Sequence, residues 1–283
     1  MKNLFDCIVV GGGPAGCAAA IHLKRSGFDV LVIEKEEIGG SLIDANIIEN
    51  IPGFSDGIKG CILAKKFEEH LLQIGVKVIF DEVLKIKIGE ENFNLICKEK
   101  SYKSRSLIVA IGLVNVGRKS KNIYTRARDL NDYDKKVIAI LGLGDAAFDA
   151  ALRFSSASKI YLIGRKIKAI EDIVKKVKKM KNVEIFECNN AKIIEKNNNK
   201  ILIKILPNDK IIEADKILIC HGKRRDRSIF PENIRVRRNS TEVYPGLFIA
   251  GDFAMPEIRY IPIALATGIM AAQGVIKYLR GEK

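Results

Sequence analysis

Short apolar runs alternate with glycine-rich turns at the start of the chain. An apolar strand over Cys7–Val10 leads into a glycine turn, Gly11–Gly16, and then into a helical pattern over Cys17–Ser26. A second strand, Asp29–Ile33, ends directly before Glu34. Strand, turn, helix and strand in this order predict a βαβ crossover, in which both strands run parallel in one sheet.

The same order of elements returns 131 positions further along the chain. The second copy has its strand, glycine turn, helix and strand at Val137–Leu141, Gly142–Ala147, Phe148–Ser155 and Lys159–Ile163. Arg165 takes the position that an acidic residue holds in the first copy. This repeat favours two nucleotide-binding domains of similar architecture over one large domain.

Short β-branched segments follow each copy, and polar breaks typical of hairpin turns separate them. They lie at Val83–Ile88, Phe93–Lys98 and Ser106–Gly112 after the first copy, and at Ala191–Glu195, Lys200–Leu206 and Lys216–Gly222 after the second. An apolar strand at Leu247–Ala250 and a helix over Pro262–Leu279 come last. We expect this strand and helix to complete the first domain, which makes the second domain an insertion.

The pattern therefore predicts an α/β fold of two Rossmann-like domains, each with three layers, ββα. At 283 residues the chain has the length of about two domains. We expect the first domain over residues 1–112 and 243–283 and the second over 113–242. The linkers are expected near Val114–Lys121 and Asn239–Pro245.

Composition narrows the class of protein. Hydrophobic residues make up 47% of the chain and charged residues 29%, which excludes a largely disordered protein. No apolar run approaches the ~18 residues of a membrane span. The start of the chain is unlike a signal peptide, because its apolar stretch passes straight into a glycine turn. We therefore expect a cytoplasmic protein without a membrane segment.

Six cysteines are scattered along the chain without a CxxC pair or a histidine at metal-ligand spacing. This pattern argues against a metal site and against a secreted disulfide framework. Cys7 and Cys220 lie in apolar strands and Cys17 on the packed face of the first helix, so we expect inert, buried thiols. His221 ends a strand at the expected cofactor cleft, but no partner residue indicates a catalytic role for it.

The formal charge of +14 allows two interpretations. It can reflect a solvated, lysine-rich surface, or it can serve an acidic partner. Nucleic acid is not the expected partner, because no RNA-binding or helix-turn-helix signature accompanies the charge.

The first glycine turn has the pattern Gly11-x-Gly13-x-x-Gly16. The first glycine makes the turn, the second lets a pyrophosphate approach the backbone, and the third lets helix and strand pack closely. The helix N-terminus adds partial positive charge, and Glu34 can accept hydrogen bonds from ribose hydroxyls. We expect a dinucleotide here; the alternative is a turn that serves packing alone.

The second turn reads Gly142-x-Gly144-x-x-Ala147, and alanine is tolerated at the third position. Arg165 stands where an acidic residue would favour NAD, beside Lys166. Because arginine can pair with a 2′-phosphate, the spacing favours NADPH, with NADH as the other possibility. The alternative is an ordinary basic loop.

Five longer segments extend these motifs. They read GGGPAG at 11–16, IGGSLIDANIIENIPGF at 38–54, VIAILGLGDAA at 137–147, PGLFIAGDFA at 245–254 and RYIPIALATGIMAA at 259–272. Together they resemble the thioredoxin reductase-like flavoproteins, which have one dinucleotide-binding domain inserted in another. The first, second and last two resemble that family's FAD segments, and the third resembles its NADPH fingerprint. The resemblance covers nearly the whole chain.

The resemblance implies FAD in the first domain and NAD(P)H in the second, with the flavin carrying the chemistry and no catalytic side chain required. It also implies a homodimer. The implied FAD residues are Gly11, Gly13, Pro14, Ala15, Gly16, Glu34, Lys35, Gly40, Ser41, Asn50, Val83, Gly251, Asp252, Arg259, Tyr260 and Ile261. The implied nicotinamide-cofactor residues are Gly142, Gly144, Asp145, Ala146, Arg165 and Lys166.

Three departures from the family pattern concern the electron acceptor. The family's redox CxxC falls at Thr125 to Arg128, where this chain has no cysteine. Ser41 and Tyr260 replace the usual glutamines near the expected flavin ring. The family's Gly-x-x-Pro-Asn is GKRRD over 222–226 in this chain.

We therefore expect an FAD-dependent NAD(P)H oxidoreductase without an active-site disulfide. Its acceptor would be a small molecule such as oxygen or a quinone, or an acidic electron-transfer protein such as ferredoxin or flavodoxin. The alternatives are a thioredoxin-disulfide reductase with unorthodox cysteines and a non-catalytic nucleotide-binding sensor. The basic residues expected to steer an acidic partner are Arg126, Arg128, Arg224, Arg225, Arg227, Arg235, Arg237 and Arg238.

Overall fold

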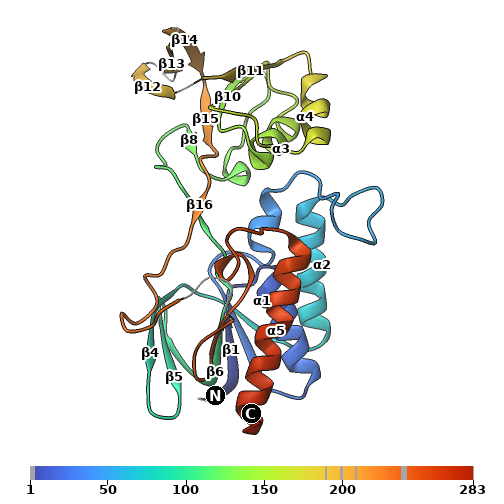
Figure 1. The fold of residues 1–283 in the computed structure, drawn as a ribbon, viewed down its shortest axis with the longest axis vertical. Coiled ribbons are helices and arrows are strands. Elements are labelled where there is room, and N and C mark those ends of the chain that lie inside the picture. Colours follow the sequence, from blue (N-terminus) through green and yellow to red (C-terminus); the bar gives the residue numbers. More distant parts are fainter. Residues whose placement is uncertain (1–3, 189, 198–199, 208, 237–240, 283) are drawn as a thin grey trace. The chain divides into compact units, whose positions relative to one another are not determined.

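The computed structural model describes residues 4–188, 190–197, 200–207, 209–236 and 241–282, which form two compact units (Figure 1). The first unit consists of Met1–Ile43, Glu49–Val114 and Arg224–Lys283. The second consists of Asp44–Ile48 and Asn115–Lys223. Each unit has its own sheet and its own hydrophobic core.

The first unit is built on an eight-stranded sheet with a parallel centre in the order β18-β6-β1-β2-β3. β17 pairs antiparallel with β18, and the hairpin β4–β5 joins antiparallel to β6. The strands are β1 (Phe5–Val10), β2 (Val30–Glu34), β3 (Lys77–Phe80), β4 (Val83–Ile88), β5 (Phe93–Cys97), β6 (Ser101–Val109), β17 (Glu242–Tyr244) and β18 (Leu247–Ile249). The central strands are continuous apolar runs because both of their faces are covered.

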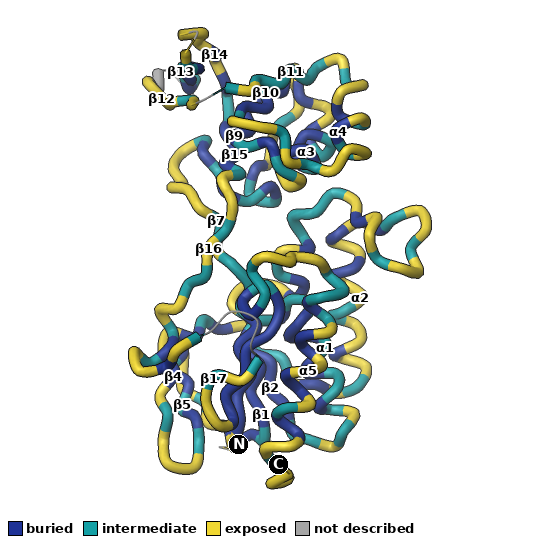
Figure 2. Tube along the Cα trace, in the orientation of Figure 1, coloured by how far each residue is buried: buried dark blue, intermediate teal, exposed yellow. Residues whose placement is uncertain are grey.

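Two hydrophobic clusters lie on opposite faces of this sheet. Alternate residues of β1 divide between them: Cys7 and Val9 face the helices, whereas Ile8 and Val10 face the β4–β5 hairpin. Figure 2 shows the buried positions concentrated in these strands. Hairpin, sheet and helices make the three predicted layers.

Three helices, α1 (Pro14–Arg25), α2 (Gly60–Gln73) and α5 (Ile261–Arg280), belong to the helical layer, with 3₁₀ turns η1 (Gly40–Asp44) and η3 (Gly251–Phe253) at its loops. α5 is long and apolar enough, by length and composition alone, to cross a membrane. Its inner face, from Ala264 to Ile276, is however buried in the cluster that includes α1. Small residues let α1 and α5 approach closely, and α5 is therefore a core helix of the first unit.

The second unit repeats this architecture around a five-stranded parallel sheet in the order β11-β10-β9-β15-β8. A three-stranded antiparallel sheet, β12-β13-β14, covers one face, and helices α3 and α4 cover the other. The elements are β8 (Ile123–Tyr124), η2 (Ala127–Asp129), β9 (Val137–Leu141), α3 (Asp145–Arg153), β10 (Lys159–Gly164), α4 (Glu171–Lys178), β11 (Val183–Glu187), β12 (Asn190–Asn197), β13 (Lys200–Leu206), β14 (Lys210–Ala214) and β15 (Lys216–Ile219).

The chain passes between the units through two short strands that pair with each other, β7 (Val114–Asn115) and β16 (Lys223–Arg224). The second passage therefore lies earlier than the expected linker near 239–245. Residues 224–236, which the sequence pattern placed with the insertion, belong to the first unit. The reason is apolar burial: Phe230 and Ile234 lie in the core beside β4, and the Ile86 N–H donates to the Ile229 carbonyl at 2.8 Å.

The predicted fold class is confirmed, and both βαβ units form where the pattern placed them. Differences occur at element ends. The first helix begins at Pro14 rather than Cys17, and β6 begins at Ser101 and ends at Val109 instead of running over Ser106–Gly112. The sequence pattern left α2 unassigned.

Candidate functional site

The glycine turn after β1 is shaped by close backbone contacts. Gly11 has φ +102°, and a Cβ there would lie 2.5 Å from the Ala110 carbonyl oxygen after β6. A Cβ at Gly16 would collide with the Gly11 carbonyl oxygen. A Cβ at Gly13, in contrast, would meet no protein atom within 4 Å. The turn is thus packed at its first and third glycines and open over the second, where the sequence predicts a pyrophosphate.

Glu34 is held at this turn by backbone donors. The Gly12 N–H donates to Glu34 Oε2 at 2.5 Å, and the Glu36 N–H donates to Oε1 at 3.0 Å. The carboxylate is half-buried at the carboxyl end of β2. It therefore lies beside the turn, at the position expected for a ribose-binding acid.

Segments far apart in the sequence meet the first turn of α1. A Cβ at Gly40 of η1 would touch the Gly13 Cα at 3.4 Å. A Cβ at Gly251 would lie 2.9 Å from the Ala15 Cβ, and a Cβ at Gly268 of α5 would collide with the Ala15 carbonyl. The Gly251 N–H also donates to Thr267 Oγ1 at 2.9 Å. η3, which carries the predicted residue Asp252, is therefore fixed at the N-terminus of α1.

The other residues that the resemblance implies for FAD have mixed environments. Lys35 Nζ forms a salt bridge with Glu82 Oε1 at 2.6 Å. Val83 is buried in the core that includes β4. The remaining positions lie on loops or at helix starts: Ser41, Asn50, Arg259 and Tyr260 are exposed, and Ile261 is half-buried in the first turn of α5. Their role in binding stays a prediction.

Arg225 is a residue whose contacts the sequence did not reveal. Its Nη2 donates to the Ala254 carbonyl at 2.8 Å, and its guanidinium lies 5.7 Å from the centroid of the Phe253 ring. Phe253 in turn stacks on Phe230, with the centroids 5.4 Å apart and the rings 9° from parallel. Arg225 therefore supports η3 from the side of residues 224–236. The signal in the sequence for a special role of Arg225 was its position in GKRRD, where the family's Gly-x-x-Pro-Asn motif has proline.

The glycine turn after β9 has the same contacts as the first turn at its first two glycines. Gly142 has φ +138°, and a Cβ there would lie 2.5 Å from the Cys220 carbonyl oxygen after β15. A Cβ at Gly144 would meet no protein atom within 4 Å. Ala147, at the third position, is fully buried in the core around α3. This turn is again packed at its ends and open in its middle.

A basic loop follows β10 beside this second turn. Gly164 packs against Leu143, since a Cβ there would lie 2.9 Å from the Leu143 Cγ, and the Lys168 N–H donates to the Leu143 carbonyl at 2.8 Å. Arg165, Lys166 and Lys168 are exposed on this loop.

Asp145, expected to contact the cofactor, shapes the same region from the first turn of α3. Its Oδ1 accepts the Ile170 N–H at 2.9 Å. Ala146, the next residue, is exposed. Asp145 therefore has a structural bond, while direct contact of either residue with a cofactor stays a prediction.

Comparisons with known proteins agree with this geometry. The family model described as "Pyridine nucleotide-disulphide oxidoreductase" matches residues 5–268. The chain belongs to this family. A "34.2 kDa protein in rubredoxin operon" of Clostridium pasteurianum is 27% identical, over 99% of both chains. The thioredoxin reductase of Aquifex aeolicus is 27% identical, over 99% of this chain and 95% of its own length. The crystal structure of T. acidophilum thioredoxin reductase has a TM-score of 0.86, with 25% identity and 99% coverage of both chains.

The protein is thus a thioredoxin reductase-like pyridine nucleotide-disulphide oxidoreductase, a flavin-dependent NAD(P)H oxidoreductase. The family uses FAD and NAD(P)H. The two glycine turns fit dinucleotides, because each leaves its second glycine open while its neighbours are packed. When bound, FAD accepts a hydride from the nicotinamide and passes the electrons on.

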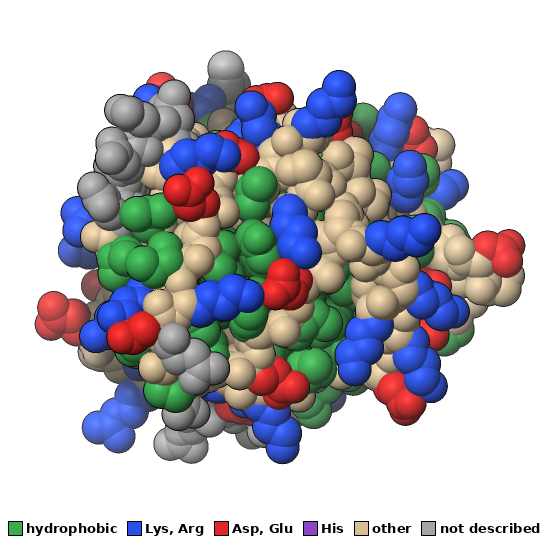
Figure 3. Space-filling model, turned by 90° about the horizontal axis from the view of Figure 1, so that it is seen from above, with side chains coloured by type: hydrophobic (Ala, Val, Ile, Leu, Met, Phe, Trp, Pro, Cys, Tyr) green, Lys and Arg blue, Asp and Glu red, His purple; other side chains and the backbone are tan. Residues whose placement is uncertain are grey.

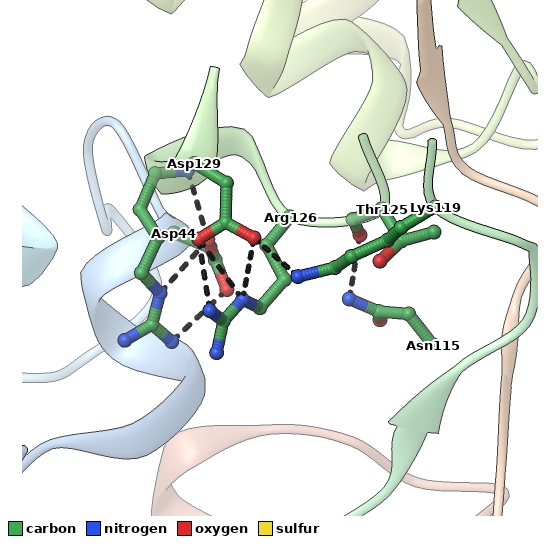
Figure 4. Close-up of polar contacts among 7 residues, drawn as sticks. Asp44, Asn115, Lys119, Thr125, Arg126 and Asp129 are labelled. Atoms are coloured by element: carbon green, nitrogen blue, oxygen red, sulfur yellow. Dashed lines mark hydrogen bonds and ion pairs between the residues drawn. The ribbon is translucent and has the colours of Figure 1, made fainter. Parts of the chain in front are cut away.

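The segment where the sequence pattern places the family's redox CxxC, Thr125 to Arg128, contributes to an ion-pair cluster (Figure 4). Thr125 is buried, and its carbonyl accepts a hydrogen bond from Asn115 Nδ2 at 2.6 Å. Asp129 Oδ1 lies 2.9 Å from Arg126 Nη2, and its Oδ2 lies 2.6 Å from Lys119 Nζ. Partial burial pushes the pKa of Asp129 upwards, but the hydrogen bonds from Arg126 and Lys119 hold that pKa below its usual range.

Arg128, where the sequence pattern places the second cysteine, binds Asp44. Its Nη2 lies 3.2 Å from Asp44 Oδ2, while its Nε and backbone N–H donate to Oδ1 at 3.2 and 3.1 Å. Both side chains are largely buried, with exposed fractions of 13% and 22%. This bidentate pair fastens the segment Asp44–Ile48 within the second unit.

All six cysteines are free, as the sequence pattern indicates. Burial raises the pKa of the thiols of Cys7, Cys17, Cys97 and Cys220 to about 12 and also raises that of Cys188. These five thiols stay protonated near neutral pH and are poor nucleophiles. Cys61 is exposed on α2.

Proposed function

We propose that this protein passes electrons from NADPH through FAD directly to an external acceptor, without an internal disulfide. The observation that carries the proposal is the ion-pair cluster at the CxxC position. Thr125 and Arg128 have no thiol, and the Arg128 guanidinium is engaged by Asp44. Because thiol–disulfide exchange needs a thiolate attacking a disulfide, this position cannot relay electrons to thioredoxin.

The proposed acceptor is an acidic electron-transfer protein such as ferredoxin or flavodoxin, with oxygen or a quinone as the small-molecule alternative. The net charge of +14 supports an acidic partner. The name of the Clostridium pasteurianum relative, which refers to a rubredoxin operon, adds rubredoxin as a candidate to test.

The structure changes which basic residues we expect to attract an acidic partner protein. Arg126 and Arg128 are engaged by Asp129 and Asp44, so they add little free positive charge. Arg224, Arg227 and Arg235 are exposed in the first unit, whereas Arg237 and Arg238 lie outside the described residues. On the face drawn in Figure 3, Lys and Arg side chains are spread among Asp and Glu side chains rather than gathered in one patch. We propose that the net charge of +14 provides the steering.

Acceptor choice can be tested by its response to salt. Reduction of ferredoxin or rubredoxin by NADPH and the purified holoenzyme is expected to fall about tenfold or more from low to high ionic strength, because exposed charges are screened. Oxygen consumption is expected to change little. If no acidic protein is reduced at low salt and peroxide forms readily, the acceptor is oxygen. If NADPH fails to bleach the bound flavin, the protein is a sensor rather than an enzyme.

NADPH is the proposed hydride donor because Arg165, Lys166 and Lys168 are exposed at the carboxyl end of β10. Charge-assisted hydrogen bonds contribute about 1.5–3 kcal/mol each before solvent screening. Arg165→Glu is expected to shift the ratio of flavin-reduction rates toward NADH by about tenfold or more. The matched control is Lys175→Glu, at an exposed lysine of α4 whose Nζ lies 2.7 Å from Glu171 Oε1. Equal rates with NADH and NADPH in the wild type would refute the preference.

A further inference from the structure

His221 occupies a defined place beside the second glycine turn. It follows Cys220, whose carbonyl oxygen packs against Gly142 and whose N–H donates to the Leu141 carbonyl at 2.7 Å. The chain then turns at Gly222, which has φ +97°. His221 therefore lies at the carboxyl edge of the sheet, after β15, which pairs with one side of β9, and the residue is exposed.

Arg165 reaches the same place from the other side of β9. It follows Gly164, which packs against Leu143 in the turn. The open position over Gly144 thus lies between two loops, one with an arginine and one with a histidine. Burial lowers the pKa of His221, and the positive charge of Arg165 lowers that pKa further.

Other charged groups lie around this edge, including Lys166 and Lys168 of the basic loop and Glu187, whose Oε2 accepts the Ile167 N–H at 3.3 Å. Asp145 of α3 is bonded to the Ile170 N–H, and Cys220 stays protonated. Lys223 and Asp44 lie close enough to shift the pKa of Cys220, in opposite directions. Arg165 is a cation that lowers the pKa of His221, so the empty site favours the neutral ring.

We propose that His221 is a phosphate-binding residue of the second nucleotide site and takes up a proton when the dinucleotide binds. The inference rests on the proposed binding of the nicotinamide cofactor to this unit. A phosphate placed between His221 and Arg165 favours the charged ring, because an opposite charge at hydrogen-bonding distance stabilises imidazolium. Affinity therefore rises as the pH falls through the His221 pKa of the complex, and levels off below that of the empty site.

The test is calorimetric titration of the FAD holoenzyme with adenosine 2′,5′-bisphosphate in two buffers that differ in ionisation enthalpy, at several pH values. The wild type is expected to take up more protons than His221→Asn, by up to about one proton per site. The protonation of the free ligand's phosphates is the same for both proteins, so the difference in uptake reports on the contact between His221 and the bound phosphate. A shift of one pKa unit in the complex corresponds to about tenfold in affinity.

His70→Asn is the matched control, since His70 is exposed on α2 of the first unit. ADP-ribose, which has a pyrophosphate and no 2′-phosphate, shows which phosphate is bound: proton uptake with both ligands indicates the pyrophosphate, and uptake with the bisphosphate alone indicates the 2′-phosphate. Binding with equal proton uptake in the wild type and His221→Asn would overturn the inference. Absence of any binding would instead contradict the proposed function.

Discussion

The first and second glycines of each turn have different physical roles. The first glycine has a positive φ. A Cβ at this position would lie 2.5 Å from a carbonyl oxygen, that of Ala110 in one turn and that of Cys220 in the other. A substitution there strains the backbone and disturbs folding itself. The second glycine, Gly13 or Gly144, faces open space, and its φ is not positive. A methyl group at that position would therefore affect a bound pyrophosphate and little else.

Gly13→Ala is expected to weaken FAD binding by about 1–3 kcal/mol, the usual cost of an added methyl group in a packed site, and to leave NADPH binding unchanged. Gly144→Ala is expected to do the reverse. Helix N-caps tolerate the exchange of glycine for alanine at a cost of about 1 kcal/mol or less. The measurements are FAD release followed by fluorescence and cofactor binding followed by calorimetry.

The two variants control each other. Loss of both cofactors in either variant would indicate a folding defect and contradict the assignment of roles.

At the scale of residues, the sequence predicted the positions ruled by local stereochemistry. The glycines and Glu34 belong to short motifs whose spacing follows from one strand, one turn and one helix. The partners of Arg225 and Arg128 were not predictable in this way. Ala254 and Asp44 lie far from them in sequence, and only the tertiary fold brings them together.

Among the elements, the segment Asp44–Ile48 has an unusual place, because it begins at the last residue of η1 and yet belongs to the second unit. Arg128 holds its first residue, and the Asn46 N–H donates to Asp149 Oδ2 of α3 at 2.7 Å. These two contacts hold the segment within the second unit.

A double-mutant cycle of Arg128→Ala and Asp44→Asn is expected to give a coupling energy of about 1–2 kcal/mol, because both side chains are largely shielded from water. The Arg105–Asp6 pair, at 3.4 Å with exposed fractions of 50% and 30%, provides the comparison and is expected to couple by about 0.5 kcal/mol or less. Urea unfolding of the holoenzyme measures both. Equal coupling in the two cycles would mean that the Arg128 pair has no special structural role.

Element prediction succeeded for strands and helices with a clear period and failed where burial is long-range. Residues 224–236 look polar and arginine-rich, yet the side chains of Phe230 and Ile234 are buried beside β4 and join the segment to the first unit. The hydrophobic pattern predicts the strands of the sheets but does not predict which unit the loop after a strand packs against.

For the molecule as a whole, the state of the cysteine thiols bears on which electron acceptor the flavin can use. Five of the six cysteines have raised pKa values, and the sixth, Cys61, is exposed on α2 away from any other cysteine in the sequence. This arrangement supports the proposal that electrons leave the flavin without an internal disulfide.

Reduction of thioredoxin or of a small aromatic disulfide by NADPH is therefore expected to remain at background, while NADPH oxidation by the proper acceptor proceeds. Cys61→Ser is expected to leave both rates unchanged. Robust thioredoxin reduction that disappears in Cys61→Ser would instead show that this protein uses an unorthodox cysteine.

The close packing of Gly251 and Gly268 against Ala15 has a consequence for biosynthesis. The turn that starts the first unit leaves the ribosome early, but η3 and α5 follow on the order of 10 to 50 s later at ordinary rates of translation. In that interval the continuous stretch Asn115–Lys223 emerges and can form its own parallel sheet. We therefore expect flavin to be acquired only after synthesis is nearly complete, by a chain whose inserted unit is already folded.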